Sequence, residues 1–364
     1  MTKMIINDEH KEDLINIAKQ FKYSSQSYPQ DENGNPTPSY LEYISMMYDP
    51  EVAKIVQHLP VFPKTININR LAKKLNIPKE EVIAKLEIPA KRTFVINTGK
   101  YYALPRPLFM HDMPFIMTIN RENEDMVKFA ELSRKYYSDE GYYKIWQNKR
   151  DGTPRMRVLT VSEEVELGHQ ILPLEEVYKL IDKYDTFALT PCPCRVRTEA
   201  EGIRECKDKF PIWNCIQMGA YANATLQAND PELKRVTKEE VIKITKEAAE
   251  LGLVHATDNE ANSAQILCAC CGCCCGMLKG ITKLGNPRGM AKANYVSTID
   301  KEACTGCETC VSRCMFDAIK VNEVAEVNPE KCMGCGVCAV TCPSDAITMV
   351  RLLREEIPGA TITE

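Results

Sequence analysis

Two consecutive stretches decide how the last part of the chain folds: VSTIDKEACTGCETCVSRCMFDAIKV at residues 296–321 and VAEVNPEKCMGCGVCAVTCPSDAITM at residues 324–349. They align at a constant offset of 28 residues. Each copy has a strand-like start, a run of four cysteines and an Asp-Ala-Ile after the last cysteine. A repeat of this kind predicts a domain with pseudo-two-fold symmetry.

Both copies share the spacing C-x-x-C-x-x-C-x-x-x-C, at Cys304, Cys307, Cys310 and Cys314 and then at Cys332, Cys335, Cys338 and Cys342. Thiolates at positions i, i+3 and i+6 hold one cubane, whereas the fourth thiolate points away and completes the other cluster. The first 4Fe–4S cluster should therefore take Cys304, Cys307, Cys310 and Cys342. The second should take Cys332, Cys335, Cys338 and Cys314.

Over about residues 295–350 the chain closely resembles the bacterial two-cluster 4Fe–4S ferredoxin domain. Pro343 follows the family pattern after Cys342, whereas Met315 replaces the family's proline after Cys314, a departure expected to affect packing or potential without preventing ligation. Two zinc sites are the alternative, but zinc motifs pair C-x-x-C units across a longer spacer. Two adjacent clusters with no catalytic residues nearby are typical of an electron-transfer chain. The repeat therefore predicts one-electron transfer.

The composition of the 364-residue chain is that of an ordinary protein with two or three domains, with 44% apolar and 26% charged residues. Its 46 Lys and Arg against 50 Asp and Glu argue against a nucleic-acid partner. No apolar run approaches the about 18 residues of a membrane span. The first residues lack the pattern of a secretion signal. We therefore expect a cytoplasmic protein.

Cysteine usage is the most unusual feature of the composition. All 18 cysteines fall between Cys192 and Cys342. A secreted disulfide scaffold would be short and would scatter its cysteines between loops. Eighteen free thiols without metal would be an oxidation liability. The pattern predicts metal ligation in a reducing compartment and excludes a plain metabolic enzyme.

Residues 1–110 are predicted to form a helical and winged-helix-like domain. Residues 8–22 and 40–58 have helical periodicity, and Pro50 is well placed to open a helix after Asp49. The polar, turn-rich segment 24–39 between them is expected to be a loop or linker.

Residues 64–104 carry the resemblance to a winged helix, because two short helices are followed by a hairpin around Asn97-Thr98-Gly99-Lys100. Between residues 60 and 106 there are ten Lys or Arg and three Glu, a local charge of +7. Pro89 inside the second helix departs from what a DNA-reading helix requires.

Residues 111–294 are predicted to form a cysteine-rich α/β domain whose cysteines lie in loops at the ends of elements, and residues 295–364 the ferredoxin domain. Strands are expected at 155–161 and 186–195, with a helix at 172–184 between them. A further helix, 237–251, has a capping box from Thr237 to Glu240 and ends at Gly252. The aromatic residues before this region are interpreted as packing residues: Tyr136, Tyr137, Tyr142, Tyr143 and Trp146.

Ten cysteines lie in the middle domain, all of them candidate metal ligands: Cys192, Cys194, Cys206 and Cys215, then Cys268, Cys270, Cys271, Cys273, Cys274 and Cys275. The first four can bind one cluster or one zinc ion, or remain unligated structural thiols. Arg195 and Arg197 are either donors to cluster sulfurs, which would raise a potential, or solvated surface cations.

The run LCACCGCCCGMLKG hides a ferredoxin-like spacing at Cys268, Cys271 and Cys274, and Gly272 and Gly276 would allow close approach of an inorganic core. Six thiols in eight residues cannot all reach one cubane, so some bind a second metal centre or are spare and reactive. We predict that both middle sets meet in space and bind one or two further 4Fe–4S clusters. Three clusters in total, with about twelve irons, is the central expectation.

Taken whole, the chain is predicted to be a multidomain α/β and α+β protein. It resembles a group of anaerobe proteins that join a winged-helix-like N-terminal part, a cysteine-rich middle and a two-cluster ferredoxin. The predicted function is an electron-transfer protein or subunit passing single electrons from a low-potential donor to a redox partner protein.

Two other functions remain open on the sequence. One is an oxidoreductase with a substrate-binding cluster in the Cys192–Cys275 region, for which His111 and His255 are the nearest catalytic candidates. The other is a redox-sensing winged-helix regulator. The chain has neither a Walker loop nor a dinucleotide motif, whereas flavin sites often leave no short motif.

Overall fold

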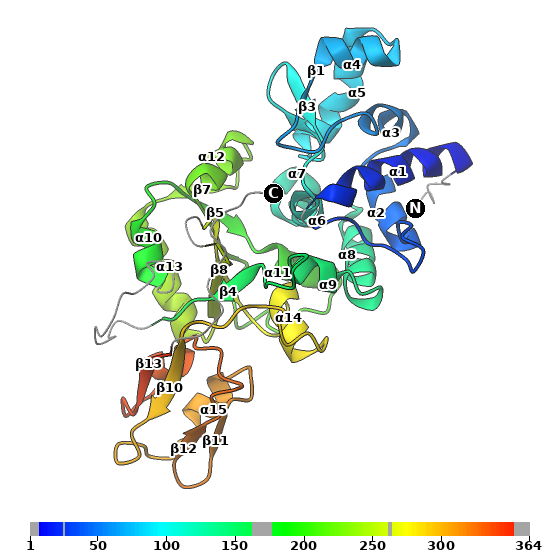
Figure 1. Ribbon diagram of the computed structural model, residues 1–364. Coiled ribbons are helices and arrows are strands. Elements are labelled where there is room, and N and C mark those ends of the chain that lie inside the picture. The colour runs from blue at the N-terminus through cyan, green and yellow to red at the C-terminus, as the bar shows by residue number, and fades with distance from the viewer. Residues whose placement is uncertain (1–6, 25, 162–176, 261–263, 353–364) are drawn as a thin grey trace. The chain divides into compact units, whose positions relative to one another are not determined.

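The computed structural model describes residues 7–24, 26–161, 177–260 and 264–352 (Figure 1). Contacts divide the chain into two compact units, one formed by Met1–Trp146 and Val196–Ile203, the other by Gln147–Arg195 and Arg204–Thr363. None of the helices in these described ranges combines the length and apolar character that a membrane span requires. The domain boundaries predicted after residues 110 and 294 stay a prediction.

The first unit is mostly helical. Its elements are α1 (Asp8–Gln20), α2 (Pro38–Ser45), α3 (Pro50–Val56), β1 (Ile66–Asn67), α4 (Ile68–Leu75), α5 (Lys79–Lys91), β2 (Ile96–Asn97), β3 (Tyr101–Ala103), α6 (Pro107–Ile116), α7 (Thr118–Arg121), α8 (Met126–Arg134) and α9 (Tyr143–Gln147). Asp49 caps α3 by accepting hydrogen bonds from the N–H groups of Glu51 and Val52, which confirms the predicted helix start.

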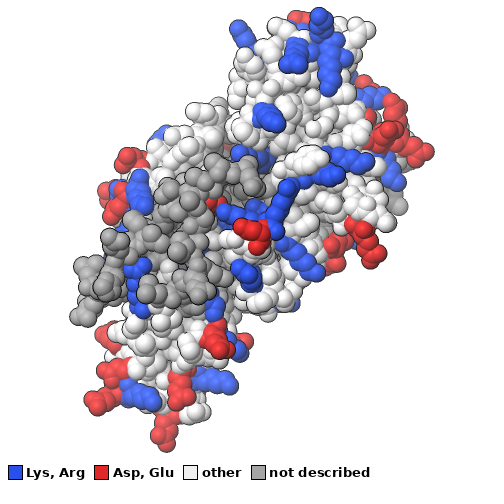
Figure 2. All heavy atoms as spheres, viewed as in Figure 1, with Lys and Arg blue, Asp and Glu red and all other residues white. Residues whose placement is uncertain are grey.

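The predicted helix pair and hairpin within residues 64–104 are present as α4, α5, β2 and β3. Strand β1 joins the hairpin in an antiparallel sheet of order β1-β3-β2. Pro89 lies inside α5, close to its C-terminal end. Figure 2 shows Lys and Arg side chains over the part of the surface where Figure 1 places α4 and α5.

An aromatic cluster forms the core around α6 and α8. Tyr136 and Tyr137 are buried, and His111 lies between them, with its Nδ1 2.6 Å from the hydroxyl of Tyr136. The ring of Trp146 lies 4.6 Å from the ring of His111, centre to centre. These side chains pack against one another, in agreement with their interpretation as packing residues.

The second unit is built on a six-stranded sheet of order β4-β8-β9-β6-β5-β7. Its strands are β4 (Met156–Val158), β5 (Phe187–Pro191), β6 (Trp213–Met218), β7 (Lys234–Val236), β8 (Val254–Asp258) and β9 (Ile266–Cys270). Every pairing in this sheet is antiparallel. The middle region contains both helices and strands, as predicted. Its sheet is antiparallel, so the arrangement is α+β and not the parallel α/β type. Parallel strands need long crossover connections, whereas neighbours such as β8 and β9 are joined by short ones.

Helices α10 (Val177–Asp182), α11 (Pro193–Ala200), α12 (Gly219–Gln227), α13 (Lys238–Glu250) and α14 (Gly276–Thr282) accompany the sheet. Apolar side chains of α10 and α13 form one core with strands β5, β6 and β9. The capping box predicted from Thr237 to Glu240 is confirmed at the start of α13. Residues 172–176 of the helix predicted at 172–184 lie outside the described residues.

The repeat at the C-terminal end folds as two similar halves. The first has β10 (Tyr295–Ile299), α15 (Thr309–Arg313) and β11 (Ile319–Val321); the second has β12 (Ala325–Val327), α16 (Val337–Val340) and β13 (Ile347–Arg351). Strand β10 pairs with β13 and β11 with β12, all antiparallel. Ile319 and Ile347, 28 residues apart, lie in one core, as the predicted symmetry requires.

Candidate metal centres

The first ferredoxin set converges on one cavity. A small pocket is lined by Cys304, Cys307, Cys310 and Cys342. Cys342 reaches it from the second copy of the repeat, whereas the other three lie in the first. The loop between Cys304 and Cys307 turns at Gly306, whose φ is 65° and where a Cβ atom would come within 2.5 Å of the Glu323 carbonyl oxygen. Glycine therefore lets this loop close around the cavity.

In the second ferredoxin set, three cysteines of the second copy are joined by Cys314 of the first copy. Burial, followed by the charges of Cys332 and Cys314, raises the pKa of Cys338 to about 11. The thiols of Cys314 and Cys332 likewise contribute to the raised pKa of Cys335. Such thiols are protonated at neutral pH until a cationic metal core replaces the protons. Both sets thus have the composition of a four-thiolate site, and each contains one cysteine from the other copy.

A serine hydroxyl lies beside the second set. The cysteine spacing in the sequence does not indicate it. Ser297 in β10 is buried, and its Oγ lies 3.1 Å from Sγ of Cys338 and 3.9 Å from Sγ of Cys332. Once Cys338 is a thiolate, the hydroxyl donates to it. The residue 28 positions later in the repeat is Ala325, which has no side-chain donor.

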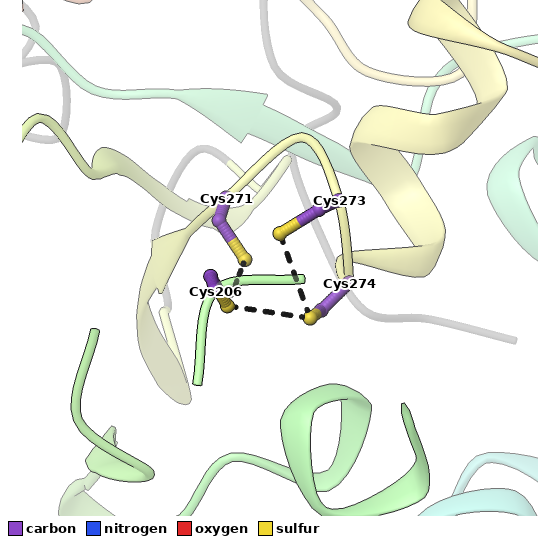
Figure 3. A group of neighbouring side chains, drawn as sticks. All are labelled: Cys206, Cys271, Cys273 and Cys274. Carbon is purple, nitrogen blue, oxygen red and sulfur yellow. Dashed lines mark hydrogen bonds between the residues drawn. The ribbon is translucent and has the colours of Figure 1, made fainter. Parts of the chain in front are cut away.

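Four middle cysteines, which we call the four-thiol group, point toward one another in Figure 3: Cys206, Cys271, Cys273 and Cys274. Their sulfur atoms all lie within 4.8 Å of one another. Hydrogen bonds from Cys273 and Cys274, and then the charge of Arg195, lower the pKa of Cys271. A thiolate at this position is ready to bind a cation.

The other six middle cysteines, the six-thiol group, are linked by a second network: Cys192, Cys194, Cys215, Cys268, Cys270 and Cys275. The thiol of Cys268 interacts with those of Cys215 and Cys270, and the thiol of Cys275 with those of Cys194 and Cys270. Hydrogen bonds from Cys268 and Cys275 lower the pKa of Cys270 to about 5. The structure thus brings the two middle sets of cysteines together, although in different combinations from those the spacing indicated.

One prediction about the middle cysteines is wrong. Cys215, Cys268 and Cys270 lie within strands β6 and β9 rather than in loops. Because Ile216 pairs with Leu267, the next pair in the register sets Cys215 opposite Cys268. Of the ferredoxin-like run, Cys268 lies in the strand, whereas Cys271 and Cys274 belong to the four-thiol group, so its binding of one cubane stays a prediction. Neighbouring strands, not loop spacing, select these partners.

Arg195 lies between the two groups. Its guanidinium donates to the carbonyl oxygens of Pro211, at 2.8 Å, and of Ala269, at 3.0 Å, and it is buried. Its pKa is raised by the charges of Cys192 and Cys271, against the effect of burial. A fixed cation here offsets the negative charge of several thiolates. Of the two predicted arginine donors, Arg195 has these contacts, whereas Arg197 donates to the His111 carbonyl and pairs with Asp112 at 3.2 Å.

The two histidines considered as catalytic candidates are both buried. His111 belongs to the aromatic core described above. Burial lowers the pKa of His255 in β8 to about 4, so its ring is neutral at pH 7. Among the described residues, neither ring nitrogen of His255 has a hydrogen-bond partner.

The ferredoxin repeat touches the loop that carries the four-thiol group. A Cβ atom placed on Gly272 would lie 3.8 Å from both Cβ and Sδ of Met315, so this methionine packs on the glycine. Met315 directly follows Cys314 of the second ferredoxin set. Met315, which stands where the family has a proline, therefore makes a packing contact between two cysteine-rich segments.

Comparison with known proteins identifies the C-terminal repeat. A family model described as a 4Fe-4S binding domain matches residues 297–320 and 325–348, one match for each copy. No curated protein and no solved structure matches the chain. The tandem match supports an iron–sulfur electron-transfer role.

Proposed function

We propose that the protein is an iron–sulfur electron-transfer protein, or the electron-transfer subunit of an oxidoreductase. It passes single electrons between a low-potential donor and a redox partner protein in anaerobic metabolism. The observation that carries the proposal is the cavity lined by three thiols of one repeat copy and Cys342 of the other. When bound, 4Fe–4S clusters in such thiolate sets take up and release single electrons.

The ferredoxin half offers an entry at the surface and an exit toward the interior. Cys307 of the first set is exposed, whereas Cys332 and Cys338 of the second set are buried. From the second set, the backbone of Cys314 leads to Met315 and across its contact with Gly272 to the turn at residues 271–274, which Cys270 and Cys275 of the six-thiol group flank in the sequence. The proposed order is therefore surface, first set, second set, six-thiol group.

The hydroxyl of Ser297 is a donor at the second set. A donor to a ligand sulfur stabilises the reduced, more negative cluster and raises its potential. In the first set the equivalent residue is Ala325, whose backbone N–H donates to Sγ of Cys304 at 3.3 Å. The hydroxyls of Thr309 and Ser344 lie 3.4 Å from Sγ of Cys307 and 3.7 Å from Sγ of Cys342. Donors to ligand sulfurs are thus present at both sets, and Ser297 contributes to the potential of the second.

The winged-helix-like part within residues 64–104 serves in this proposal as the module that contacts the partner. Its surface is basic, because residues 60–106 carry a charge of +7. A basic surface steers an acidic partner protein toward the molecule.

Anaerobic purification followed by a reductive titration tests the proposed function. We expect 4Fe–4S electron paramagnetic resonance signals that appear on reduction with a low-potential donor and disappear on reoxidation. Cys310→Ser should remove the signal of one ferredoxin cluster, whereas Ser312→Ala, an exposed position two residues along the same helix, should leave both. Clusters that stay redox-inert over the accessible range would contradict the proposal.

A further inference from the structure

The spacing of the four-thiol group is that of a site for one ion. Sγ of Cys206 lies 3.9 Å from Sγ of Cys271 and 3.6 Å from Sγ of Cys274, and the sulfurs of Cys273 and Cys274 are 3.7 Å apart (Figure 3). Zn–S bonds of about 2.3 Å at tetrahedral angles place thiolate sulfurs about 3.8 Å from one another. The three separations agree with this value.

A cubane requires a different spacing. Its four thiolates bind four separate irons and point away from one another, so their sulfurs stand farther apart than around a single ion. The ferredoxin sets follow this rule: within the described part of the chain, no three of their eight thiols lie within 4.8 Å of one another. The same holds for the six-thiol group among the described residues. The four-thiol group is thus distinct from the other cysteine sets of the same chain.

We propose that Cys206, Cys271, Cys273 and Cys274 bind one Zn²⁺ ion. Tetrahedral sulfur ligation suits zinc, and a thiolate site binds Zn²⁺ more tightly than Fe²⁺. Cys206, Cys271 and Cys274 are buried, which protects the site from exchange with solvent. Four thiolates leave a zinc site with a net charge of −2, and the buried guanidinium of Arg195 beside Cys271 offsets part of it.

The zinc ion has a structural role, since Zn²⁺ undergoes no redox change. It ties the distant Cys206 to the turn that follows β9. That turn also presents Gly272 to Met315 and leads to Cys275 of the six-thiol group. The inference does not depend on the electron-transfer role, because a metal content can be measured whether or not the iron centres exchange electrons.

The test is metal analysis of the full-length protein, purified anaerobically from zinc-supplied medium and dialysed against a chelator. We expect about one zinc per chain, with an X-ray absorption spectrum of four sulfur neighbours at about 2.3 Å. Cys206→Ser should lower the retained zinc at least tenfold and leave the iron content unchanged. Cys215→Ser, in the six-thiol group, is the matched control and should keep its zinc.

Cys206→Ser could lose zinc only because it does not fold. Cys206→His tests for this, because imidazole is also a zinc ligand. This variant should retain zinc, with one nitrogen in place of one sulfur in the absorption spectrum. Wild-type protein without zinc, together with a loss of about four irons in Cys206→Ser, would show that the group holds a cubane instead. Zinc that is retained in Cys206→Ser would also overturn the assignment.

Discussion

Ser297 is the single side chain with the clearest expected effect on a potential. Its hydroxyl lies 3.1 Å from Sγ of Cys338, on the buried face of β10. Ser297→Ala removes this donor without changing the backbone. A neutral hydrogen bond contributes about 1 kcal/mol, which is about 40 mV for a one-electron couple. We expect the potential of one ferredoxin cluster to fall by about this amount.

Redox titration monitored by electron paramagnetic resonance measures this shift. Thr298→Ala is the matched control, since Thr298 is the next residue of the same strand and its hydroxyl lies 2.8 Å from that of Thr348 on the exposed face. Thr298→Ala should leave the reduction potentials of both ferredoxin clusters unchanged from the wild type. A potential that does not move in Ser297→Ala, or that moves equally in the control, would contradict the assigned role.

Among elements, helix α13 links the stability of the sheet to the metal centres. Val241 and Ala249 pack into the core of the sheet, and Ala248 lies in one cluster with Cys206, Cys271 and Cys274. The helix begins with the capping box, in which Glu240 N–H donates to Thr237 Oγ1 at 3.2 Å and Thr237 N–H donates to Glu240 Oε2 at 2.7 Å.

Thr237→Ala removes the side-chain acceptor of this box. Loss of such a cap costs about 1 kcal/mol, so hydrogen exchange in the first turns of α13 should quicken by about fivefold. Thr237→Ser keeps the hydroxyl and should exchange as the wild type does. Equal protection in all three proteins would mean that tertiary packing, not the cap, holds the start of this helix.

The elements also explain what a sequence can predict here. The ferredoxin halves, the cap of α13 and the helix–hairpin order of residues 64–104 follow local rules, and all are present. The partners of the middle cysteines follow from strand order instead. Cys215 and Cys268 are 53 positions apart along the chain and become neighbours only because β6 pairs with β9. No local spacing encodes such a pairing.

For the whole molecule, the two cysteine-rich regions form a connected system within the second unit. The N–H of Val161, just after β4, donates to the carbonyl oxygen of Cys335 at 3.0 Å, and the hydroxyl of Thr160 donates to that of Gly334 at 2.8 Å. With the packing of Met315 on Gly272, these bonds attach the second ferredoxin set to the segments around the sheet. We propose two clusters in the repeat, one in the six-thiol group and a zinc ion in the four-thiol group.

The number of irons per chain separates these assignments. Anaerobically purified wild-type protein should contain about twelve irons, four for each of three cubanes, and Cys215→Ser should contain about eight. A wild-type value near eight that Cys215→Ser leaves unchanged would contradict the account, because the six-thiol group would then hold no cluster.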